Sequence, residues 1–591
     1  MKSPLSVYQD KIEQYQTALS SIKKKLFASS MLRLAVFLVF AFLVYYFFGN
    51  TSLVLLFIFL GIAGFLFLVS RHTDLQQEKE KLKQLIALNE TEIKVLQRDF
   101  HHLPNGKEFV NPQHEFSQDI DLFGDRSFFQ YLNRTALASG KQKLADLLSS
   151  NDIHQIKEKQ EGIQELAEKI DFRQEFTAIA NMVKAKIKSS IILDWLNDYQ
   201  AFVPSIFKWL PQVFSIVSLS LLIALSLDYI HWWYFAGWFA IGWLIIGRFS
   251  KKVNELSHYL GEVQNTFQQY HLLLELIETA TFEAEFNQEQ QNRIHDEQKK
   301  ASLLLKEFSK TIDALERKNV LFFGQAISGF MLWDLWKAYE LEQWMNQHYN
   351  RVENWFEVID FFDAYNSLGG FAFNHQQYTF PKIQQNQVIL KTTEAVHPLI
   401  NPTDAVTNDY QINKEEFFII TGANMAGKST FLRTVSLQIM MANVGLPVCA
   451  KTCEYSPIKL ITSMRTVDSL ADEASYFYSE LSRLKFIVDE IKNDEYFIIL
   501  DEILKGTNST DKAIGSRKFV EKLVNSHSSG IIATHDLSLC EVAKELPQVK
   551  NHYFDAEIIN DELHFDYRFK DGICQNMNAS FLLRKMNIVD S

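Results

Sequence analysis

Long apolar runs dominate the pattern of hydrophobic and polar positions in the first half of the chain. Residues 34–48 and 53–69 contain no charged side chain, and only a turn-forming tetrapeptide, 49–52, separates them. The first run extends to 31–48 if Arg33 reaches the membrane interface, which brings it close to the roughly 20 residues that cross a bilayer. The pattern therefore predicts a transmembrane helical hairpin.

A second pair of apolar runs, at about 210–227 and 232–247, predicts a second hairpin of the same kind. Trp and Tyr residues lie near the ends of these runs, as in the aromatic belts of membrane proteins. Basic residues flank the outer ends of both hairpins, whereas neither connecting turn contains Lys or Arg. They are Lys23, Lys24, Lys25, Arg33, Arg71, Lys208, Arg248, Lys251 and Lys252. This asymmetry predicts an integral protein of the cytoplasmic membrane, with both termini cytoplasmic.

An alternative interpretation is that the four runs are buried helices of a large soluble core. The charge asymmetry favours the membrane interpretation. A cleaved signal peptide is disfavoured, because the first run begins about thirty residues into the chain and a second run follows at once. A weaker run, 320–333, is interrupted by polar residues and predicts a core helix.

The remaining part of the first half has helical periodicity. Apolar residues recur at three- and four-residue steps in 5–30 and 75–96, which predicts cytoplasmic extensions of the first hairpin that can pack antiparallel. Residues 250–318 form a long, charge-rich helical stretch with almost no Gly or Pro. Its local basic positions are Lys299, Lys300, Lys306 and Lys310. Interleaved acidic residues favour a solvated helix face over a DNA-contacting one.

Composition narrows the class of protein. The 591 residues allow about four structural units. The formal net charge of -12 excludes a globally basic nucleic-acid binder, although a local basic groove stays open. The cysteines are Cys449, Cys453, Cys540 and Cys574. They include no C-x-x-C pair, so we expect buried thiols in a reducing compartment rather than a zinc site or a disulfide framework.

The last third of the chain alternates short apolar strands with helices. Strand 417–420 leads into 422–429, which matches G-x-x-x-x-G-K-[ST] and precedes an apolar helix over 430–441. In such a P-loop, backbone N–H groups and the helix dipole hold phosphate oxygens. Lys428 would contact the β- and γ-phosphates, and Ser429 would ligate Mg²⁺. The predicted ATP-binding residues of the loop are Gly422, Ala423, Asn424, Met425, Ala426, Gly427, Lys428, Ser429 and Thr430.

Two further strands supply polar groups that fit phosphoryl transfer to water. Strand 496–500 ends in Asp501, expected to hold Mg²⁺, and Glu502, expected to polarise the attacking water. Strand 530–534 ends in His535, for which we expect a γ-phosphate sensor, with a core or surface histidine as the alternative. The sequence thus predicts an ATP hydrolase. Its predicted catalytic residues are Glu502, Lys428 and His535, and its metal ligands are Ser429 and Asp501.

At this point the sequence resembles the MutS family of DNA mismatch repair ATPases. The motifs that carry the resemblance are ITGANMAGKST (420–430), DSLADEAS (468–475), DEILKGT (501–507) and ATH (533–535). Weaker similarity is found around Leu122, Asn133 to Thr135, Gly140, Gln160 to Ile163, Asp363, Ser367 and His397 to Leu399. The resemblance covers roughly 115–200 and 350–587, and is strong only in the second span.

The resemblance implies an ABC-type ATPase domain that binds ATP and Mg²⁺, forms a homodimer through this domain, and takes DNA as a ligand. It implies that Ser475 reaches the nucleotide of the partner subunit. It also places Asn408 and Tyr553 at the adenine pocket, with a purely structural tyrosine as the alternative. We expect no counterpart of the family's mismatch-reading domain, because the first hundred residues hold a hairpin instead.

The predicted fold class is multidomain, a helical core with two transmembrane hairpins followed by a C-terminal α/β P-loop ATPase domain. The expected domains are 1–100 with the first hairpin (31–48 and 53–69), 101–385 as a MutS-like helical region with the second (210–227 and 232–247), and 386–591 as the ATPase. The predicted function is a membrane-anchored clamp driven by Mg-ATP that binds DNA. A membrane signalling or transport-coupling ATPase without DNA is the alternative, and the intact acidic pair disfavours a purely structural scaffold.

Overall fold

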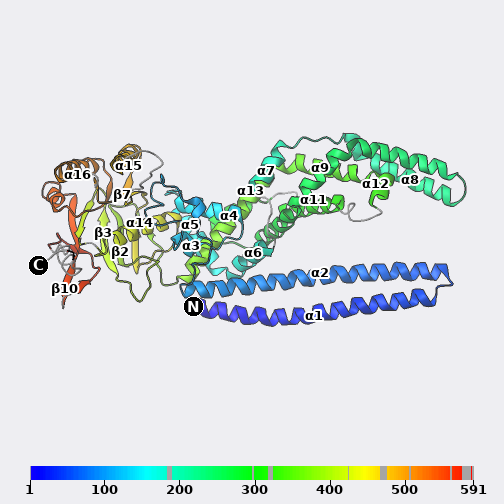
Figure 1. Ribbon diagram of the computed structural model, residues 1–591, viewed down its shortest axis with the longest axis horizontal. Coiled ribbons are helices and arrows are strands. Elements are labelled where there is room, and N and C mark those ends of the chain that lie inside the picture. The colour runs from blue at the N-terminus through cyan, green and yellow to red at the C-terminus, as the bar shows by residue number, and fades with distance from the viewer. Residues whose placement is uncertain are drawn as a thin grey trace.

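The computed structural model shows an elongated molecule with a C-terminal α/β domain at one end and two helical arms at the other (Figure 1). A helical body lies between the arms and the α/β domain. The structure describes residues 2–182, 189–295, 299–316, 324–423, 425–465, 476–504, 508–559, 562–575 and 588.

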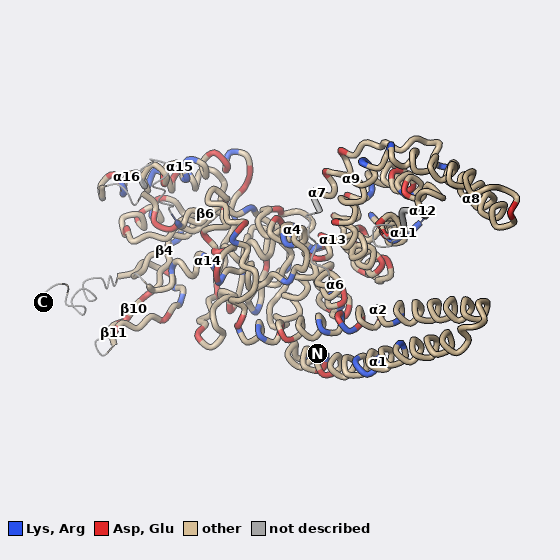
Figure 2. Tube along the Cα trace, turned by 45° about the vertical axis from the view of Figure 1, so that its right-hand side comes forward, with Lys and Arg blue, Asp and Glu red and all other residues tan. Residues whose placement is uncertain are grey.

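The first arm is a hairpin of two long helices, α1 (Pro4–Tyr46) and α2 (Thr51–Leu96). The side chain of Asn50 accepts a hydrogen bond from the N–H of Leu53 (3.3 Å) and so begins α2. The predicted apolar runs and their amphipathic extensions are therefore continuous helices, and the predicted turn separates them. Few charged residues lie on the distal half of this hairpin (Figure 2).

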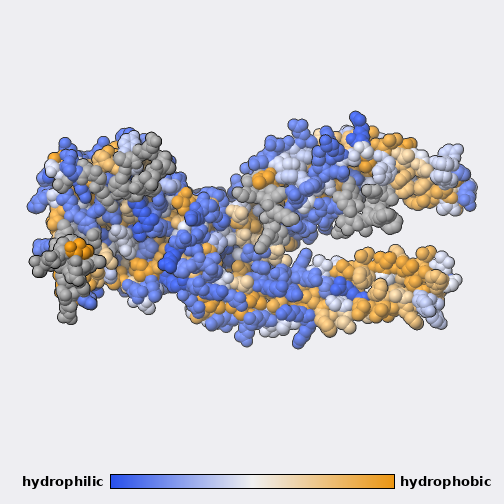
Figure 3. Space-filling model, in the orientation of Figure 1, coloured by the Kyte–Doolittle hydropathy of each residue, from blue (hydrophilic) through white to orange (hydrophobic). Residues whose placement is uncertain are grey.

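Both helices of the first arm are long and apolar enough to cross a membrane. In each of them the most apolar 18-residue window is 0% buried. In the space-filling view, hydrophobic residues gather at the far ends of both arms (Figure 3). Length and composition thus permit the predicted membrane hairpin, while the crossing itself stays a prediction.

The second arm contains the remaining apolar runs. Its helices are α8 (Leu210–Ser226), α9 (Trp232–Thr279), α11 (Ala301–Glu316), α12 (Gly324–Met331) and α13 (Trp333–Asn374). The predicted second hairpin corresponds to α8 and the beginning of α9. Among the described helices, α8 is apolar but shorter than those of the first arm, and α9 is long enough but its apolar beginning is less hydrophobic. The Trp, Tyr and Gly residues at its start lower its hydropathy.

Helix α12 lies inside the weak run for which we expect a core helix, and it packs against α8 and α9. Contact between α9 and α12 is very close, because a Cβ added at Gly242 would lie 2.2 Å from the carbonyl oxygen of Gly329. The hydroxyl of Ser218 on α8 donates to the carbonyl of Phe330 (2.8 Å) and accepts from Nε1 of Trp238 (2.9 Å). Small residues and shared hydroxyl hydrogen bonds are typical of helix packing in membranes.

The body is formed by shorter helices, most of which pack against the C-terminal half of α13. They are α3 (Phe128–Leu132), α4 (Ala138–Ser149), α5 (Ile156–Glu168), α6 (Ile170–Met182), α7 (Ser189–Asp198) and α10 (Glu285–Asn292), with 3-10 turns η1 (Lys107–Phe109) and η2 (Ser205–Lys208).

Asp363 of α13 joins α13 to the beginning of α4. Its carboxyl group accepts hydrogen bonds from the N–H groups of Ala136 (3.0 Å) and Leu137 (2.9 Å). A Cβ at Gly140 would lie 2.1 Å from this carboxyl group, so only glycine at this position leaves room for the carboxyl group of Asp363. Burial raises the pKa of Asp363 to about 7. The residues that resemble the family in this region therefore have a structural role.

In its described residues, the α/β domain contains three sheets. Its strands are β1 (Lys382–Ile383), β2 (Val388–Ala395), β3 (Asn408–Asn413), β4 (Phe417–Gly422), β5 (Thr452–Tyr455), β6 (Lys459–Ser463), β7 (Tyr496–Asp501), β8 (Ser529–Ala533), β9 (Val549–Phe554), β10 (Ala556–Ile559), β11 (Glu562–Phe565) and β12 (Lys570–Asp571). The main sheet has the order β12-β9-β4-β8-β7-β6, with β12 antiparallel and the other strands parallel. The other sheets are β1-β5-β2-β3 and the hairpin β10-β11.

Helices cover both faces of the main sheet. Phe418 and Ile420 of β4 belong to the core that includes α14 (Lys428–Val444) and continues into the body. Phe417 and Ile419 point to the opposite face, covered by α15 (Tyr476–Glu490), α16 (Ser509–Val524) and the 3-10 segment η4 (Leu537–Lys544). The carboxyl ends of β4, β7 and β8 meet at one edge of this sheet, where the candidate site lies.

Candidate nucleotide site

The segment between β4 and α14 forms a tight loop at the end of the central strand. Gly427 is the N-cap of α14 and has a φ of 107°, which favours glycine. A Cβ at Gly422 would lie 2.5 Å from the carbonyl oxygen of Phe554. Both glycines of the motif are thus required by backbone geometry, and Lys428, Ser429 and Thr430 at the start of α14 line the cavity described below.

Lys428, the first residue of α14, is buried at this edge of the sheet. Its ammonium group donates to the carbonyls of Gly422 (2.7 Å) and Ala423 (3.1 Å) and lies 3.3 Å from Nε2 of His535. Burial lowers the pKa of Lys428, and the carboxylates of Asp501 and Glu502 oppose this effect. A cation is therefore held beside two acidic side chains in a partly desolvated position.

Ser429, Asp501 and Glu502 complete the polar cluster. The hydroxyl of Ser429 donates to Oδ2 of Asp501 (2.8 Å), so two oxygen atoms from different segments face each other. The backbone N–H of Glu502 donates to the carbonyl of Ala533 (2.9 Å), which fixes the end of β7 against β8. Oε1 of Glu502 lies 3.5 Å from Nε2 of His535. The structure brings together all five residues that we expected to carry the chemistry.

His535 follows β8 and faces both Lys428 and Glu502. Burial lowers the pKa of His535, the charge of Lys428 lowers it further, and the carboxylate of Glu502 opposes both. A neutral imidazole is therefore favoured at neutral pH. Because an ammonium group can only donate, Nε2 of the neutral ring accepts the hydrogen bond from Lys428.

A cavity of about 700 Å³ opens beside this cluster. Its lining includes Met425, the Gly427-to-Thr430 segment and the polar side chains of Asp501, Glu502 and His535. Residues of the β2–β3 loop, Asn408 and Tyr567 also line it. A volume of this size accommodates a nucleotide.

Tyr410, Phe431, Phe554 and Tyr567 all line the cavity, and Tyr567 is the most exposed of the four. The ring of Tyr567 lies beside the loop that follows β4, because a Cβ on Gly427 would lie 3.2 Å from its Cδ1. Tyr553 lies outside the set of described residues that line the cavity; it pairs with Thr421 in the sheet and its ring contacts Gly572. Asn408 does line the cavity and fixes the segment that carries Tyr567, donating from Nδ2 to the carbonyl of Tyr567 (3.1 Å).

Sequence reasoning missed Tyr567 because no local motif surrounds it. Its sequence neighbours, Asp566 and Arg568, are not part of a known nucleotide-binding pattern. Two expected site residues, Asn424 and Ser475, lie outside the described residues.

Two carboxylates outside the motifs connect the α/β domain to the body. Asp121 contacts Arg433 of α14 (3.3 Å to NH1) and Arg465 after β6 (2.8 Å to NH1). Asp119 accepts from the hydroxyl of Thr462 (2.6 Å) and from the N–H of Arg465 (2.9 Å). The P-loop helix and the end of β6 are therefore attached to the same short segment of the body.

The α/β domain matches a known family model. Residues 418–585 match the model described as MutS domain V. The chain is 28% identical over 258 residues to the DNA mismatch repair protein MutS of Staphylococcus haemolyticus, covering 42% of this chain and 29% of the relative. It is 32% identical over 231 residues to the protein of the same name from Persephonella marina, covering 38% and 26%. It is 30% identical over 194 residues to MutS protein homolog 4 of Homo sapiens, covering 31% and 20%. The chain therefore spans less than a third of the length of these relatives.

Proposed function

We propose that this chain, whose residues 418–585 match the family model of MutS domain V, is a membrane-anchored ATPase that uses Mg-ATP to move its two arms. The observation that carries the proposal is the convergence of Lys428, Ser429, Asp501, Glu502 and His535 at one end of a cavity of nucleotide size. ATP hydrolysis uses groups of these kinds. Lys428 supplies a cation, Ser429 and Asp501 supply oxygen ligands for a metal, Glu502 accepts a proton, and His535 is a neutral imidazole.

Each residue has a defined part in this chemistry. Lys428 exchanges its loop carbonyls for β- and γ-phosphate oxygens, and the start of α14 contributes N–H donors. Glu502 orients a water molecule and accepts its proton as the water oxygen bonds to the γ-phosphorus and the bond to the β-phosphate oxygen breaks. His535, neutral and 3.3 Å from Lys428, contacts the γ-phosphate and reports its loss.

The facing oxygens of Ser429 and Asp501 fit a Mg²⁺ ion. Mg²⁺ prefers oxygen ligands and is commonly bound by one or two protein groups together with substrate phosphates. Among the described residues there is no cluster of three or more His, Cys, Asp or Glu side chains that would hold a metal unaided. When bound, Mg²⁺ supplies positive charge that stabilises the phosphate oxygens.

Membrane anchoring is supported by the direction of the arms. Both arms extend away from the α/β domain to the same side, and both end in hydrophobic surface (Figures 1 and 3). Exposed apolar residues at these ends include Phe42 (63%) on the first arm and Ile216 (66%) on the second. Patches of this kind mark contact with a membrane or a partner. A bilayer placed there contacts both arms at once and leaves the α/β domain in the cytoplasm.

The partners follow from the relatives. Homodimerisation through the α/β domains, with Ser475 contacting the nucleotide of the partner subunit, is proposed on the family resemblance alone. DNA is proposed as the ligand because the relatives are named for DNA mismatch repair.

A second candidate, a membrane signalling or transport-coupling ATPase without DNA, is favoured by a specific observation. The arm ends, where a clamp on DNA would close, are apolar rather than basic in the described parts of the chain. DNA binding depends on Lys and Arg contacts to phosphates. This candidate keeps the same ATPase chemistry and assigns its output to the membrane.

The test is the rate of ATP hydrolysis by the detergent-solubilised protein without DNA and with homoduplex, mismatched and branched DNA. Lys428→Ala is the inactive reference. Lys414→Ala, an exposed lysine between β3 and β4, is the matched control and should hydrolyse ATP like the wild type. Stimulation by one DNA form supports a membrane-tethered DNA sensor, and a DNA-independent rate supports the second candidate. Hydrolysis that persists in Lys428→Ala would refute the proposed site.

The membrane topology is tested separately. Single cysteines at Asn50 and Asp228, in the two hairpin turns, should react in intact cells with a membrane-impermeant maleimide. A cysteine at Lys414 should react only after lysis. Labelling of the turns only after lysis would refute the proposed topology.

A further inference from the structure

Helix α2 connects the apolar end of the first arm directly to the wall of the nucleotide cavity. Its 46 residues correspond to a length of about 69 Å. The helix ends in a tight turn in which the N–H of Arg98 donates to the carbonyl of Val95 (2.9 Å) and that of Asp99 to the carbonyl of Lys94 (2.9 Å). Arg98 has a φ of 68°, so its side chain leaves the helix in a direction fixed by the turn.

The guanidinium group of Arg98 binds the β2–β3 loop at two points. One terminal nitrogen donates to the carbonyl of Pro398 and the other to the carbonyl of Ile400, each at 2.8 Å. The planar guanidinium fixes the spacing of its donors, so this fork sets the positions of both carbonyls together. His397 and Ile400 of the same loop line the cavity. Arg98 therefore holds the cavity wall without lining the cavity itself.

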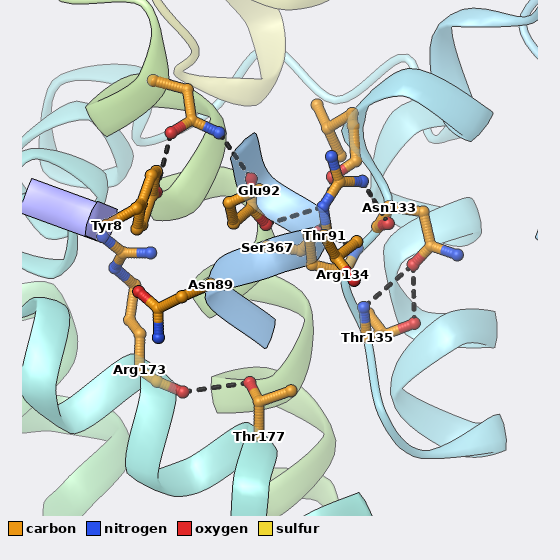
Figure 4. Close-up of polar contacts among 12 residues, drawn as sticks. Tyr8, Asn89, Thr91, Glu92, Asn133, Arg134, Thr135, Arg173, Thr177 and Ser367 are labelled. Carbon is orange, nitrogen blue, oxygen red and sulfur yellow. Dashed lines mark hydrogen bonds and ion pairs between the residues drawn. The ribbon is translucent and has the colours of Figure 1, made fainter. Parts of the chain in front are cut away.

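The base of α2 is firmly attached to the body (Figure 4). Glu92 accepts a hydrogen bond from Nε of Arg134 (2.7 Å) and another from Nδ2 of Asn374 (2.7 Å). Oδ1 of Asn374 accepts from the hydroxyl of Tyr8 on α1 (2.7 Å), so both helices of the first arm share one joint. Arg134 and Glu92 are each 14% exposed, where an ion pair is less screened than on the surface. The base of the hairpin is thus held at one place on the body by specific polar contacts.

We propose that Arg98 is a positioning residue that links the tilt of the membrane hairpin to the shape of the ATP cavity at the β2–β3 loop. The proposal rests on the proposed function, since it requires ATP in the cavity and lipid around the hairpin. A change in the tilt of α2 moves the fork and with it the carbonyls of residues 398 and 400. Thermodynamic linkage then requires that nucleotide binding shifts the tilt in return.

The test measures the dissociation constant for a fluorescent ATP analogue with the full-length protein in nanodiscs. Arg98→Ala should weaken binding by about tenfold, because both charge-assisted hydrogen bonds to the loop are lost. Arg98→Lys, which can supply a single point donor, should fall between Ala and the wild type. Lys94→Ala removes an exposed positive charge one turn earlier and should bind like the wild type. The turnover of bound ATP should not change, since Arg98 does not reach the reacting groups.

Bilayer thickness tests the link to the membrane. Thin dimyristoleoyl- and thick dierucoyl-phosphatidylcholine discs impose different tilts on a hairpin of fixed length. The wild type should bind the analogue with different affinities in the two discs, and Arg98→Ala should lose that difference. Hydrogen exchange of residues 399–406 should be faster in Arg98→Ala than in the wild type, while exchange in α14 stays the same, which excludes general unfolding.

Two results would overturn the inference. One is Arg98→Ala binding as tightly as the wild type with unchanged exchange in the loop. The other is a wild-type affinity that is identical in thin and thick discs. Failure of the proposed function is distinguishable, because in that case Lys428→Ala would bind the analogue as the wild type does, or the cysteine at Asn50 would be labelled only after lysis.

Discussion

Replacing Tyr567 by alanine tests which aromatic ring contacts the adenine base. Tyr567 lines the cavity beside Gly427, and its ring stacks on that of Phe565, with centroids 5.9 Å apart. Asn408 holds the backbone of this segment through the carbonyl of Tyr567 and the N–H of Phe569 (2.7 Å). Because these bonds involve backbone atoms, removal of the ring leaves the segment in place. The substitution therefore removes a stacking surface and little else.

The expected loss of ATP affinity in Tyr567→Ala follows from the exposure of the Tyr567 ring. Base–aromatic stacking contributes about 1–3 kcal/mol. Tyr567 is 42% exposed, so only part of its ring is available to a base inside the cavity, and we take the lower part of that range. A loss of about 1.4 kcal/mol corresponds to about tenfold weaker binding. Tyr567→Phe keeps the ring and should bind within about twofold of the wild type.

The assay is calorimetric titration of the detergent-solubilised protein with ATP in the presence of Mg²⁺. The matched control is Tyr553→Ala, which removes the aromatic residue expected from the sequence but absent from the cavity lining. We expect its dissociation constant to stay within about twofold of the wild type. The reasoning would be refuted if Tyr553→Ala weakened binding about tenfold while Tyr567→Ala did not.

Three further predictions follow from other parts of the chain. Glu502→Gln should bind ATP but hydrolyse it at least about 100-fold more slowly in single-turnover assays, because the general base is lost; an unchanged rate would contradict its role. Gly242→Ala should lower the thermal midpoint, since its Cβ meets the Gly329 carbonyl at 2.2 Å, whereas Gly237→Ala, with nothing within 4 Å, should not; equal midpoints would contradict the close packing of α9 on α12. The buried carboxyl of Asp363 has a pKa of about 7 in the fold and near 3.8 when unfolded, so its contribution to wild-type stability falls as pH rises from about 4 to 7. Asp363→Asn should lose less stability over this range in thermal unfolding; parallel pH profiles would contradict burial of the carboxyl.

The helices of the first arm were predictable because their signals are local. Each apolar run and each amphipathic extension was visible as a run or a period in the sequence, and α1 and α2 join them without interruption. The turn between them was marked by small polar residues, and Asn50 caps the second helix. The second arm was harder, because the Trp and Gly residues that lower the hydropathy of α9 also shape its packing on α12, which no local pattern encodes.

The meeting of the polar residues at one edge of the sheet was predictable for a related reason. Lys428, Asp501 and His535 each follow a short buried strand, and adjacent parallel strands bring such residues to one edge. The rest of the lining was not predictable. Asn408 holds the segment that carries Tyr567, and Arg98 holds the β2–β3 loop from 300 positions away from Pro398. Contacts at this separation depend on the assembled fold, and Tyr553, chosen on the resemblance, lies outside the described lining.

The two arms reach the walls of the cavity by different routes. The first arm contacts the β2–β3 loop through Arg98, and His397 and Ile400 of that loop line the cavity. The second arm continues into α13, which packs against α4 and α5, and these helices pack against α14. Gly445 at the C-terminal end of α14 lies against Lys159 and Gln160 of α5, whereas the first turn of α14 lines the cavity. In the described residues, the first arm therefore contacts the cavity lining through a single loop, and the second arm reaches it through the length of α14.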